Sequence, residues 1–400
     1  MDLINKTIVL GITGGVAAFK ACELVRLLTA QGANIHVVMT EAAIHFIGQA
    51  TFQALSGNKV WLDQWDPSVP NNMAHIELTR NADCVLIAPA SADFISKLAH
   101  GSANDLLSTL CLARNCPLVI APAMNKQMWE NAATVRNMAT IVADGTSVFG
   151  PTSGNQACGE TGMGRMLEAN EICEDLIGLF KPKLLAGKRV LITAGPTFEA
   201  IDPVRGITNH SSGKMGYAVA RACVQAGASV QLVSGPCAQI VPRHVHAIHV
   251  QSALQMHKAV MDQAQASDIF IGVAAVADWR PTNASEQKIK KSGVNPSIEL
   301  TENPDILAQV ARIPSGPWCV GFAAESEALE KHGQEKRHRK GIPLLVANIG
   351  HETFGKDDNT LLLIDDNGLE RLPRASKTQL AYELVKAIAQ RYSNLQKAVH

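Results

Sequence analysis

The residue whose surroundings most suggest chemistry is Cys158, in the segment GNQACGETGMGRM (154–166). A cysteine of a hydrophobic core is normally surrounded by Leu, Ile and Val, whereas this one lies among glycines and polar residues. The glycines let this segment bend freely, so the thiol is placed on a loop and not in a core. The alternative is a small, unused residue in a glycine-rich turn.

Further candidates in the first half follow apolar runs that predict strands. The loops APASAD (88–93) and APAMN (121–125) each come after such a run, and the turn GITGG (11–15) opens an amphipathic pattern. The carboxyl ends of parallel strands form the ligand-binding edge of open α/β sheets. Small residues there let a flat ring approach the backbone, and a helix start can bind phosphate. His75 is a candidate acid or base near the same edge.

The second half contains a different set of polar residues. ITNHSSGKMG (207–216) is typical of an anion-binding helix start, and a serine-capped helix would explain only one of its serines. The P-loop pattern GxxxxGK[ST] is absent, which disfavours a kinase or an ordinary ATPase. AAVADWRP (274–281) and the basic run KIKK (288–291) follow, and lysines are common partners of phosphates. A basic run by itself is more often a solvated face.

These residues require elements that position them, and the sequence predicts two α/β domains. Residues 7–40 read as strand, glycine turn, amphipathic helix and strand, and residues 188–235 repeat this plan with an insertion at 198–210. The plan is typical of doubly wound, Rossmann-like parallel sheets. Pro182 and Gly187 mark a boundary, which gives domains 1–183 and 184–400. An Asn-Gly pair at 367–368 predicts a hairpin, and 376–392 a final amphipathic helix.

Composition excludes several classes of function. The formal net charge is zero, so no global field favours nucleic acid or an anionic membrane. We expect no signal peptide and no spanning helix, because no apolar stretch approaches the ~18 residues required. Nine scattered cysteines without a CxxC pair predict reduced thiols and a cytoplasmic protein. We interpret HVHAIH (244–249) as exposed strand histidines and EKRHRK (335–340) as one face of a helix.

The motifs together resemble a known family. His75, APASAD, PAMNKQMW (122–129) and the Cys158 segment resemble the flavin-dependent cysteine decarboxylases. The motifs IDPVR, ITNHSSGKMG, AAVADWRP, KIKK, ENPDIL and GFAAE resemble the ligase half of the bifunctional phosphopantothenoylcysteine decarboxylase/phosphopantothenate–cysteine ligases. The resemblance covers essentially the whole chain. It implies a flavodoxin-like flavoprotein domain followed by a nucleotide-binding ligase domain.

For the first half, the resemblance implies an FMN-dependent decarboxylation of an N-acyl cysteine. The substrate thiol is oxidised, carbon dioxide is lost, and Cys158, on a flexible glycine-rich flap that closes over the substrate, donates a proton when the product is reduced again. His75 would carry acid/base chemistry, and Asn125 would hold the substrate carboxylate by hydrogen bonds. The implied flavin contacts are Gly14, Gly15, Thr40, Ser91 and Met124.

For the second half, the resemblance implies a ligation that uses CTP and Mg²⁺. The carboxylate of 4′-phosphopantothenate forms an acyl-cytidylate, and the amine of L-cysteine then displaces CMP. Asn209 would bind the acyl intermediate, Lys288 would stabilise developing charge, and Asp278 would bind the metal or the ribose. The implied phosphate contacts are Ser211, Ser212 and Gly213. The implied nucleotide contacts are Gly272, Val273, Ala274, Asp278, Lys288, Pro304, Asp305, Ile306, Leu307, Phe322, Lys336 and Lys340.

The resemblance also implies homo-oligomers, with trimers of decarboxylase domains and dimers of ligase domains building a dodecamer. No nucleic acid or membrane partner is expected. Two rival interpretations stay open. A two-domain NAD(P)-dependent oxidoreductase would explain the strand–glycine–helix starts, but not Cys158, KIKK or the missing GxGxxG pattern. A non-catalytic flavoprotein would need neither the flap cysteine nor a complete ligase half.

Overall fold

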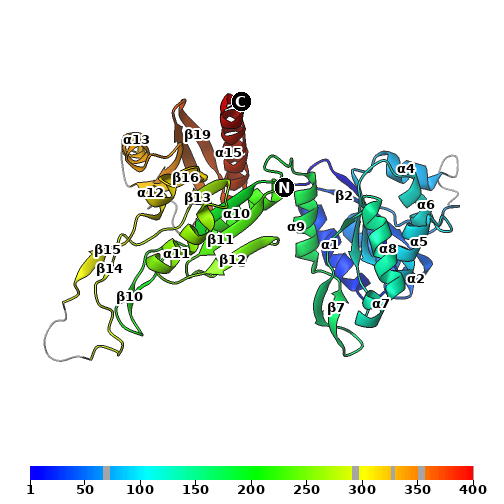
Figure 1. Ribbon diagram of the computed structural model, residues 1–400. Coiled ribbons are helices and arrows are strands. Elements are labelled where there is room, and N and C mark those ends of the chain that lie inside the picture. The colour runs from blue at the N-terminus through cyan, green and yellow to red at the C-terminus, as the bar shows by residue number, and fades with distance from the viewer. Residues whose placement is uncertain (66–72, 291–296, 326–328, 350–355, 400) are drawn as a thin grey trace. The chain divides into compact units, whose positions relative to one another are not determined.

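The computed structural model describes residues 1–65, 73–290, 297–325, 329–349 and 356–399 (Figure 1). The chain divides into two compact units, Met1–Phe180 and Lys181–His400. The run KIKK extends past the described residues, since Lys291 lies outside them. No helix among the described residues is both long enough and apolar enough to span a membrane.

The first unit is built on a parallel sheet with the order β2-β1-β3-β4-β5. Its strands are β1 (Thr7–Ile12), β2 (Asn34–Met39), β3 (Cys84–Ala90), β4 (Leu118–Pro122) and β5 (Ser147–Val148). Its helices are α1 (Ala18–Ala30), α2 (Glu41–Ile44), α3 (Gln49–Ser56), α4 (Ala74–Arg80), α5 (Ala92–His100), α6 (Leu106–Ala113), α7 (Lys126–Glu130), α8 (Ala132–Ala143) and α9 (Ala169–Phe180). The predicted doubly wound plan is confirmed.

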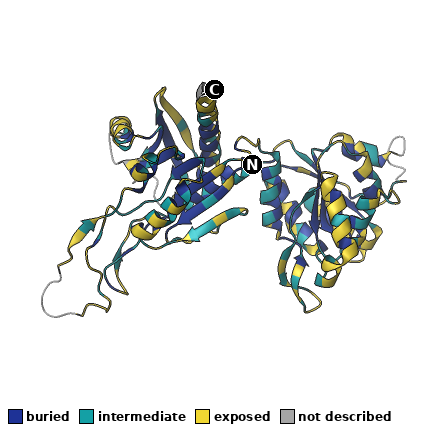
Figure 2. Ribbon diagram, in the orientation of Figure 1, coloured by how far each residue is buried: buried dark blue, intermediate teal, exposed yellow. Residues whose placement is uncertain are grey.

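Both faces of this sheet are buried, as Figure 2 shows for its strands. On β1, Ile8 and Leu10 belong to the core under α1 and α9, whereas Val9 belongs to the core under α4, α5 and α6. Successive side chains of a strand point to opposite faces, so a strand covered on both faces must be apolar at every position. This requirement explains the near-continuous apolar runs that made these strands recognisable in the sequence.

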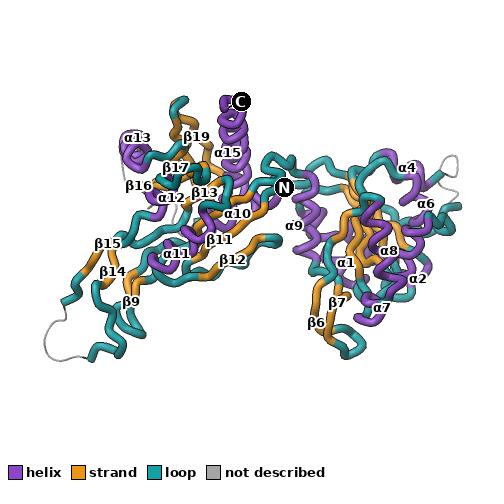
Figure 3. Tube along the Cα trace, in the orientation of Figure 1, coloured by secondary structure: helices purple, strands orange, loops and turns teal. Residues whose placement is uncertain are grey.

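The segment around Cys158 forms a small antiparallel hairpin. Strands β6 (Thr152–Asn155) and β7 (Thr161–Arg165) pair with each other, apart from the five-stranded sheet. Figure 3 shows the hairpin projecting from its unit. Cys158 lies in the connecting turn and is exposed. We expected a glycine-rich flap here, and the structure adds that paired strands carry the thiol at their tip.

The second unit has an eight-stranded sheet with the order β12-β11-β8-β13-β16-β17-β18-β19. Its strands are β8 (Arg189–Ala194), β11 (Ser229–Ser234), β12 (Val245–His249), β13 (Ile269–Gly272), β16 (Trp318–Glu325), β17 (Leu344–Ile349), β18 (Asp358–Asp365) and β19 (Gly368–Ser376). Its helices are α10 (Lys214–Gln225), α11 (Ala253–Ala264), α12 (Ile306–Ala311), α13 (Leu329–Lys340) and α15 (Lys377–Val399). The first six strands in the order are parallel, and β18 and β19 are antiparallel.

The two helix layers of this unit cover opposite faces of the sheet. Helices α10 and α15 share a core with Val190 and Ile192 of β8, whereas α11, α12 and α13 pack on the face that contains Leu191. The predicted hairpin is confirmed as β18–β19, in which Asp365 pairs with Gly368. The predicted final helix is confirmed as α15 and continues beyond residue 392.

The insertion after β8 forms part of an arm, with β14 and β15, that projects from the sheet of its unit (Figure 1). The arm contains two short antiparallel pairs: β9 (Glu199–Ala200) with β10 (Gly206–Ile207), and β14 (Trp279–Pro281) with β15 (Leu300–Glu302). Asp202 is buried in the arm and accepts hydrogen bonds from the guanidinium of Arg205 and from the N–H of Ile289 at 3.1 Å. The guanidinium of Arg205 holds the pKa of Asp202 far below its usual value. Asp202 therefore anchors the segment that follows Lys288.

Candidate active sites at two sheet edges

Each unit has a point in its sheet where successive connections leave in opposite directions. In the first unit this switch point lies between β1 and β3, and in the second it lies between β8 and β13. The loops that follow such a pair of strands separate and leave a crevice at the carboxyl edge, where open α/β sheets bind ligands. The candidate residues of both halves are therefore best examined at these two edges.

In the first unit, Thr13 connects the loops at the carboxyl edge of the sheet by hydrogen bonds. Its hydroxyl donates to the carbonyl of Pro89 at 2.7 Å and accepts the N–H of Ser91 at 2.9 Å. Ser91 in turn caps α5 by accepting the N–H of Phe94, and the N–H of Thr40 donates to the carbonyl of Ile12 at 3.0 Å. The ends of β1, β2 and β3 are thus joined. Thr13 was not among the predicted contacts, although it stands inside the GITGG turn that signalled the site.

Gly14 and Gly15, the two adjacent glycines of this turn, are small for different physical reasons. A Cβ on Gly14 would lie 2.6 Å from the Cβ of Ala42, so this position is glycine because α2 packs against it. A Cβ on Gly15 would meet no atom within 4 Å, which leaves open space at the edge. Open space beside small residues and helix-start N–H groups fits the ring and phosphate of a flavin. Of the two glycines among the predicted cofactor contacts, Gly15 is the one that borders free volume.

The hairpin brings Cys158 and Asn125 to a common partner. The thiol of Cys158 lies 3.6 Å from Glu160 Oε2, and the amide of Asn125 donates to the same oxygen at 3.4 Å. Asn125 Oδ1 also caps α7 by accepting the N–H of Met128 at 2.9 Å. Glu160 was not predicted, although it stands two residues after Cys158 in the motif. The carboxylate holds the amide and the thiol in one polar group at the hairpin tip.

The hairpin packs directly on the loop that contains Met124. The N–H of Met124 donates to the carbonyl of Gly164 at 2.9 Å. Gly164 has φ of +123°, and a Cβ there would lie 2.4 Å from the carbonyl oxygen of Met124. Only glycine allows this approach, both for its backbone conformation and for the space. The position of the flap relative to Asn125 therefore depends on Gly164.

His75 is not joined to this group by any contact that the structure describes. It is the second residue of α4, is half-buried, and its carbonyl accepts the hydroxyl of Thr79 at 2.7 Å. In the described part of the chain, no hydrogen bond or ion pair links its ring to Asn125 or Cys158. The three predicted catalytic residues of the first half are thus brought together only in part.

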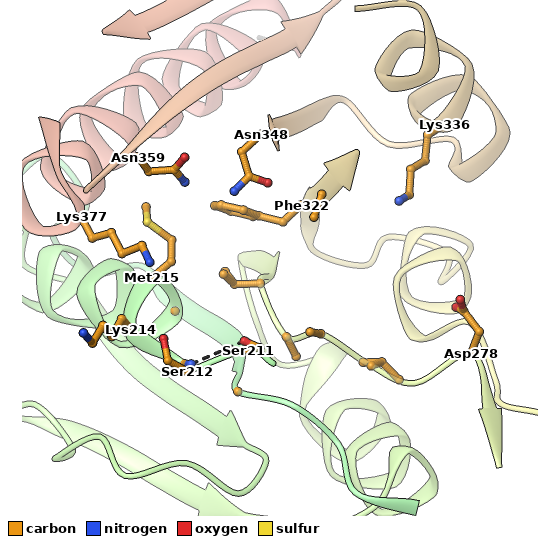
Figure 4. Close-up of a pocket in the computed structure, with 18 residues that line it drawn as sticks. Ser211, Ser212, Lys214, Met215, Asp278, Phe322, Lys336, Asn348, Asn359 and Lys377 are labelled. Carbon is orange, nitrogen blue, oxygen red and sulfur yellow. Dashed lines mark hydrogen bonds between the residues drawn. The ribbon is translucent and has the colours of Figure 1, made fainter. Parts of the chain in front are cut away.

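In the second unit, a cavity of about 290 Å³ lies at the switch point (Figure 4). The loop after β8, the start of α10 and the loop after β13 form one part of its wall. The ends of β16 and β17, with β18 and α15, form the other. Its polar lining includes Ser211, Ser212, Lys214, Asp278, Lys336, Asn348, Asn359 and Lys377. The predicted phosphate contacts Ser211, Ser212 and Gly213 all line this cavity, as does Val273.

An adjoining cavity of about 570 Å³ contains most of the predicted nucleotide contacts. Those that line it are Gly272, Ala274, Asp278, Pro304, Asp305, Ile306, Leu307, Phe322, Lys336 and Lys340. Trp279 and Arg339 also line it and were not predicted, although each stands beside a predicted residue. Asp278, Phe322 and Lys336 border both cavities, so the two form one continuous site.

Asp305 and Lys340 form an ion pair on the wall of the larger cavity. Asp305 caps α12 by accepting the N–H of Ala308 at 3.0 Å. Burial alone would raise the pKa of Asp305, but the bonds from Lys340 and Ala308 hold the pKa below its usual value. Lys336 stands one helical turn before Lys340 on α13, so both lysines face the cavity. The predicted helix face over 335–340 is confirmed.

Asn209 connects the two loops that border the smaller cavity. Its Nδ2 donates to the carbonyl of Ala275 at 2.6 Å, and its Oδ1 accepts the N–H of Ser211 at 3.0 Å. The first bond crosses to the loop after β13, and the second stays within the loop before α10. Asn209 therefore holds the loop before α10 against the loop that follows β13.

Lys288 lies away from both cavity linings. It is exposed in the connection between β14 and β15, and the next residue, Ile289, is anchored by Asp202 and Arg205. As in the first unit, one predicted catalytic residue is not brought to the others by the contacts that the structure describes.

The structure gives no separate support for a metal cluster. Among the described residues, no group of three or more His, Cys, Asp or Glu side chains is placed to hold a metal ion. Asp278 is the carboxylate that borders both cavities, so a metal there would need ligands from a bound substrate. The histidines at 244, 246 and 249 are exposed on or beside β12, as expected from the sequence.

Comparisons with known proteins match both units. The family described as Flavoprotein matches residues 2–181, and the family described as DNA/pantothenate metabolism flavoprotein C-terminal domain matches residues 185–392. The chain is 50% identical over 393 residues to the coenzyme A biosynthesis bifunctional protein CoaBC of Vibrio cholerae, covering 97% of this chain and 98% of that protein. It is 49% identical over 396 residues to the CoaBC protein of Haemophilus influenzae, covering 98% of this chain and 99% of that protein.

A solved structure is similar to about half of the chain. The crystal structure of the C-terminal domain of a coenzyme A biosynthesis bifunctional protein CoaBC is 39% identical, with a TM-score of 0.47. The match covers 53% of this chain and 99% of that one.

Proposed function

The chain belongs to the family of the coenzyme A biosynthesis bifunctional proteins CoaBC, and from this premise we propose that it makes 4′-phosphopantetheine in two steps. Residues 184–400 join L-cysteine to 4′-phosphopantothenate, and residues 1–183 decarboxylate the product. The observation that carries the proposal is that one chain builds a separate site at each of its two switch points. One site presents a thiol on a hairpin, and the other a lysine-lined double cavity.

The decarboxylase half would bind FMN at the edge formed by Gly15, Thr40, Ser91 and Met124. When bound, FMN supplies a two-electron acceptor that takes electrons from the substrate and returns them after carbon dioxide is lost. Asn125 orients the substrate carboxylate with a neutral amide, which does not stabilise the ground-state charge as a salt bridge would. Cys158 donates a proton to the product carbon, and His75 moves the proton of the substrate thiol. Glu160 keeps Cys158 and Asn125 in one group.

The ligase half would use CTP with Mg²⁺. A carboxylate oxygen of 4′-phosphopantothenate bonds to the α-phosphorus, and the bond from that phosphorus to the bridging oxygen breaks to release pyrophosphate. The amine of cysteine then attacks the acyl carbon, loses a proton and displaces CMP. Lys336 and Lys340 hold the nucleotide, Asp278 binds the metal or the ribose, and Asn209 binds the acyl intermediate. Lys288 would stabilise the charge that develops.

Both sites would be completed by further copies of the chain. The family resemblance implies trimers of the first half and dimers of the second. His75 and Lys288, which have no described contact with the residues they are proposed to assist, would then act at the sites of neighbouring copies. The nine free cysteines support a reducing, cytoplasmic location.

One assay tests the proposal. The purified chain receives 4′-phosphopantothenate, L-cysteine, Mg²⁺ and either CTP or ATP, and the products are identified by mass spectrometry, with a chelator as the control for the metal. We expect CMP, pyrophosphate, carbon dioxide and 4′-phosphopantetheine with CTP. Formation of the acyl-cysteine without loss of carbon dioxide would contradict the assignment of the first half. Bound flavin without any turnover would favour a non-catalytic flavoprotein.

A further inference from the structure

The smaller cavity of the second unit has two polar residues that the sequence motifs did not indicate. Lys377 is the first residue of α15, and Asn359 is the second residue of β18. Both line the cavity beside the start of α10, and both are deeply buried, with exposed fractions of 8% and 4%. Long charged side chains are rarely buried without a function or a partner for the charge. Their placement in a cavity wall therefore calls for an explanation.

A network of hydrogen bonds fixes these residues in place. Lys377 Nζ donates to the carbonyl of Lys356 at 2.5 Å, and the N–H of Lys377 donates to the carbonyl of Asp357 at 2.9 Å. The side chain of Asp357 accepts from Lys214 Nζ at 2.5 Å. The first turns of α10 and α15 are thus joined through one short segment. An ammonium group carries three donor hydrogens, and Lys377 lines the cavity, so it can donate to a ligand there while its backbone bond to Asp357 keeps the start of α15 in place.

The charges of the cavity favour an anion. Three lysines line it, Lys214, Lys336 and Lys377, against one carboxylate in the lining, Asp278, and Asp357 outside the lining pairs with Lys214. Burial lowers the pKa of Lys377 and the nearby charge of Lys214 lowers it further, while Asp357 and Asp358 raise it without restoring the usual value. An anion bound beside the ammonium would raise the pKa further. Gly213 caps α10 at φ of +75°, and the first N–H groups of that twelve-residue helix add a partial positive charge.

Figure 4 shows Lys377, Asn359 and Asn348 on one side of the cavity and Ser211 and Ser212 below them. Amide, hydroxyl and ammonium donors from four parts of the chain thus surround one small volume. A phosphate group has several acceptor oxygens and is the ligand that such a set of donors recognises. Resting on the ligase function proposed above, we infer that Lys377 and Asn359 complete, with Ser211–Gly213, a subsite for a phosphate group of a ligase substrate.

Two phosphate sources share this chemistry. One is the pair of terminal phosphates of the nucleotide, and the other is the phosphate of 4′-phosphopantothenate. The shared borders at Asp278, Phe322 and Lys336 favour the nucleotide, because its chain can pass from the larger cavity into the smaller one. When the bond from the α-phosphorus to the bridging oxygen breaks, the leaving pyrophosphate takes the electron pair. Lys377 would stabilise the negative charge that then gathers on it.

The test compares four ligands by calorimetry on the full chain: CTP, CMP, 4′-phosphopantothenate and pantothenate. We expect Lys377→Met to weaken the binding of CTP by about tenfold or more, because a charge-assisted bond to the terminal phosphates is lost. The affinity for CMP should not change. Weaker binding of 4′-phosphopantothenate, with unchanged binding of pantothenate, would support the subsite but assign it to the phosphate of 4′-phosphopantothenate. Unchanged affinity for all four ligands would overturn it.

Matched variants separate this subsite from a general effect on folding. Lys386→Met removes an exposed lysine from the same helix and should change none of the affinities. Asn359→Asp is isosteric and places a negative charge in the cavity, so we expect it to weaken the same ligand as Lys377→Met. Asn367→Asp in the exposed β18–β19 turn is its control. If Lys377→Met does not fold, Asn359→Asp decides: unchanged affinities would reject the subsite.

The outcome for the subsite is distinguishable from the outcome for the proposed ligase function. If the wild-type chain binds neither CTP nor 4′-phosphopantothenate, the ligase function fails. If the wild-type chain binds them and the cavity variants bind them equally well, only the subsite fails. Decarboxylation of supplied 4′-phosphopantothenoylcysteine should be unchanged in every variant, since the first unit holds that site.

Discussion

The two units have their candidate ligand sites at the same place in the fold, but different residues line the two sites. Each has its candidate site at the carboxyl edge of a parallel sheet, where connections diverge on either side of β1 or of β8. The first edge consists of backbone groups and small side chains around Gly15 and Ser91, which suits a flat ring. The second edge is lined by lysines, asparagines and serines, which suit phosphates. Fold therefore decides where a ligand binds, and the lining residues decide which ligand it is.

The two units also differ in what carries their reactive group. Cys158 stands on a paired hairpin that packs on the loop containing Met124, so its position is set within its own unit. Lys288 stands on the arm, where Asp202 and Arg205 anchor its neighbour Ile289. This contrast can be tested by variants that disable one half and spare the other.

The largest expected effect is the loss of one half-reaction alone. Cys158→Ser should lower decarboxylation by roughly 10²–10⁴-fold, the range typical of a lost proton donor, and leave ligation unchanged. Each half-reaction is measured separately, from released carbon dioxide and from released pyrophosphate. Cys116→Ser is the matched control, a partly exposed thiol of the same unit. A parallel fall in both half-reactions would contradict the division of labour between the units.

The next prediction concerns the residue on the arm. Lys288→Met should lower ligation by about 10²-fold, as expected when a group that stabilises developing charge is removed. If Lys288 acts on the cavity of another copy, mixing this variant with an Asn209→Ala chain should restore part of the pyrophosphate release. In such a mixed dimer, one cavity has both intact residues. A mixture that stays as inactive as its separate components would show that each chain supplies its own Lys288.

A smaller effect tests how tightly the hairpin is positioned. Gly164→Ala should lower decarboxylation by about 10–100-fold, since the new Cβ must push the hairpin away from Met124 and misplace Cys158. Gly145→Ala, at φ of +86° and with no atom within 4 Å of its Cβ, imposes similar backbone strain away from the hairpin. Its decarboxylation rate should remain close to that of the wild type. Equal losses in the two variants would mean that strain, not the hairpin contact, controls the rate.

The smallest effects come from two ion pairs of the same design. In each unit an aspartate caps a helix and pairs with a lysine: Asp105 with Lys97, and Asp305 with Lys340. Lys97→Met and Lys340→Met should each lower the free energy of unfolding by about 0.5 kcal/mol, as for partly exposed pairs. Lys340→Met alone should raise the KM for CTP, by about threefold to tenfold, because of these two pairs only Asp305–Lys340 borders the larger cavity, where we propose that the nucleotide binds.

The pH dependence of these pairs has a definite sign. For both Asp105 and Asp305, burial raises the pKa, but the bonds from the lysine and the helix N–H outweigh it and lower the pKa. Each pair therefore stabilises the fold fully above the unfolded value, near ~3.9, and less as the pH falls through the lower, folded pKa. In urea unfolding, the difference between wild type and each lysine variant should shrink over that range. A difference that grows there would contradict the ion pairs.

Several features followed directly from the sequence. The apolar runs of β1, β3 and β8 were recognisable because a strand buried on both faces requires apolar residues at every position. The position of each candidate loop after such a run placed it at the carboxyl edge. The Asn-Gly pair gave the β18–β19 hairpin, because that pair favours the backbone conformation of a tight turn.

Other features depended on packing between distant segments. Lys214 and Asp357 are 143 residues apart, and nothing local to either predicts their contact. Lys377 begins a helix whose amphipathic pattern was clear, yet that pattern says nothing about which loop the first turn faces. Likewise, Glu160 was visible as a residue of the motif, but not as the shared partner of Cys158 and Asn125.

The sequence by itself determined the two α/β units, the edges where their loops gather and the thiol on a glycine-rich segment. These features arise from the spacing of apolar residues, the apolar content of each segment and the residues that favour turns, all of which act over a few neighbouring residues. Only the tertiary structure decided which side chains meet across those edges, and it left His75 and Lys288 apart from the groups they were expected to join. The physical reason is that a binding site is a property of packing, in which each residue is positioned by partners far away along the chain.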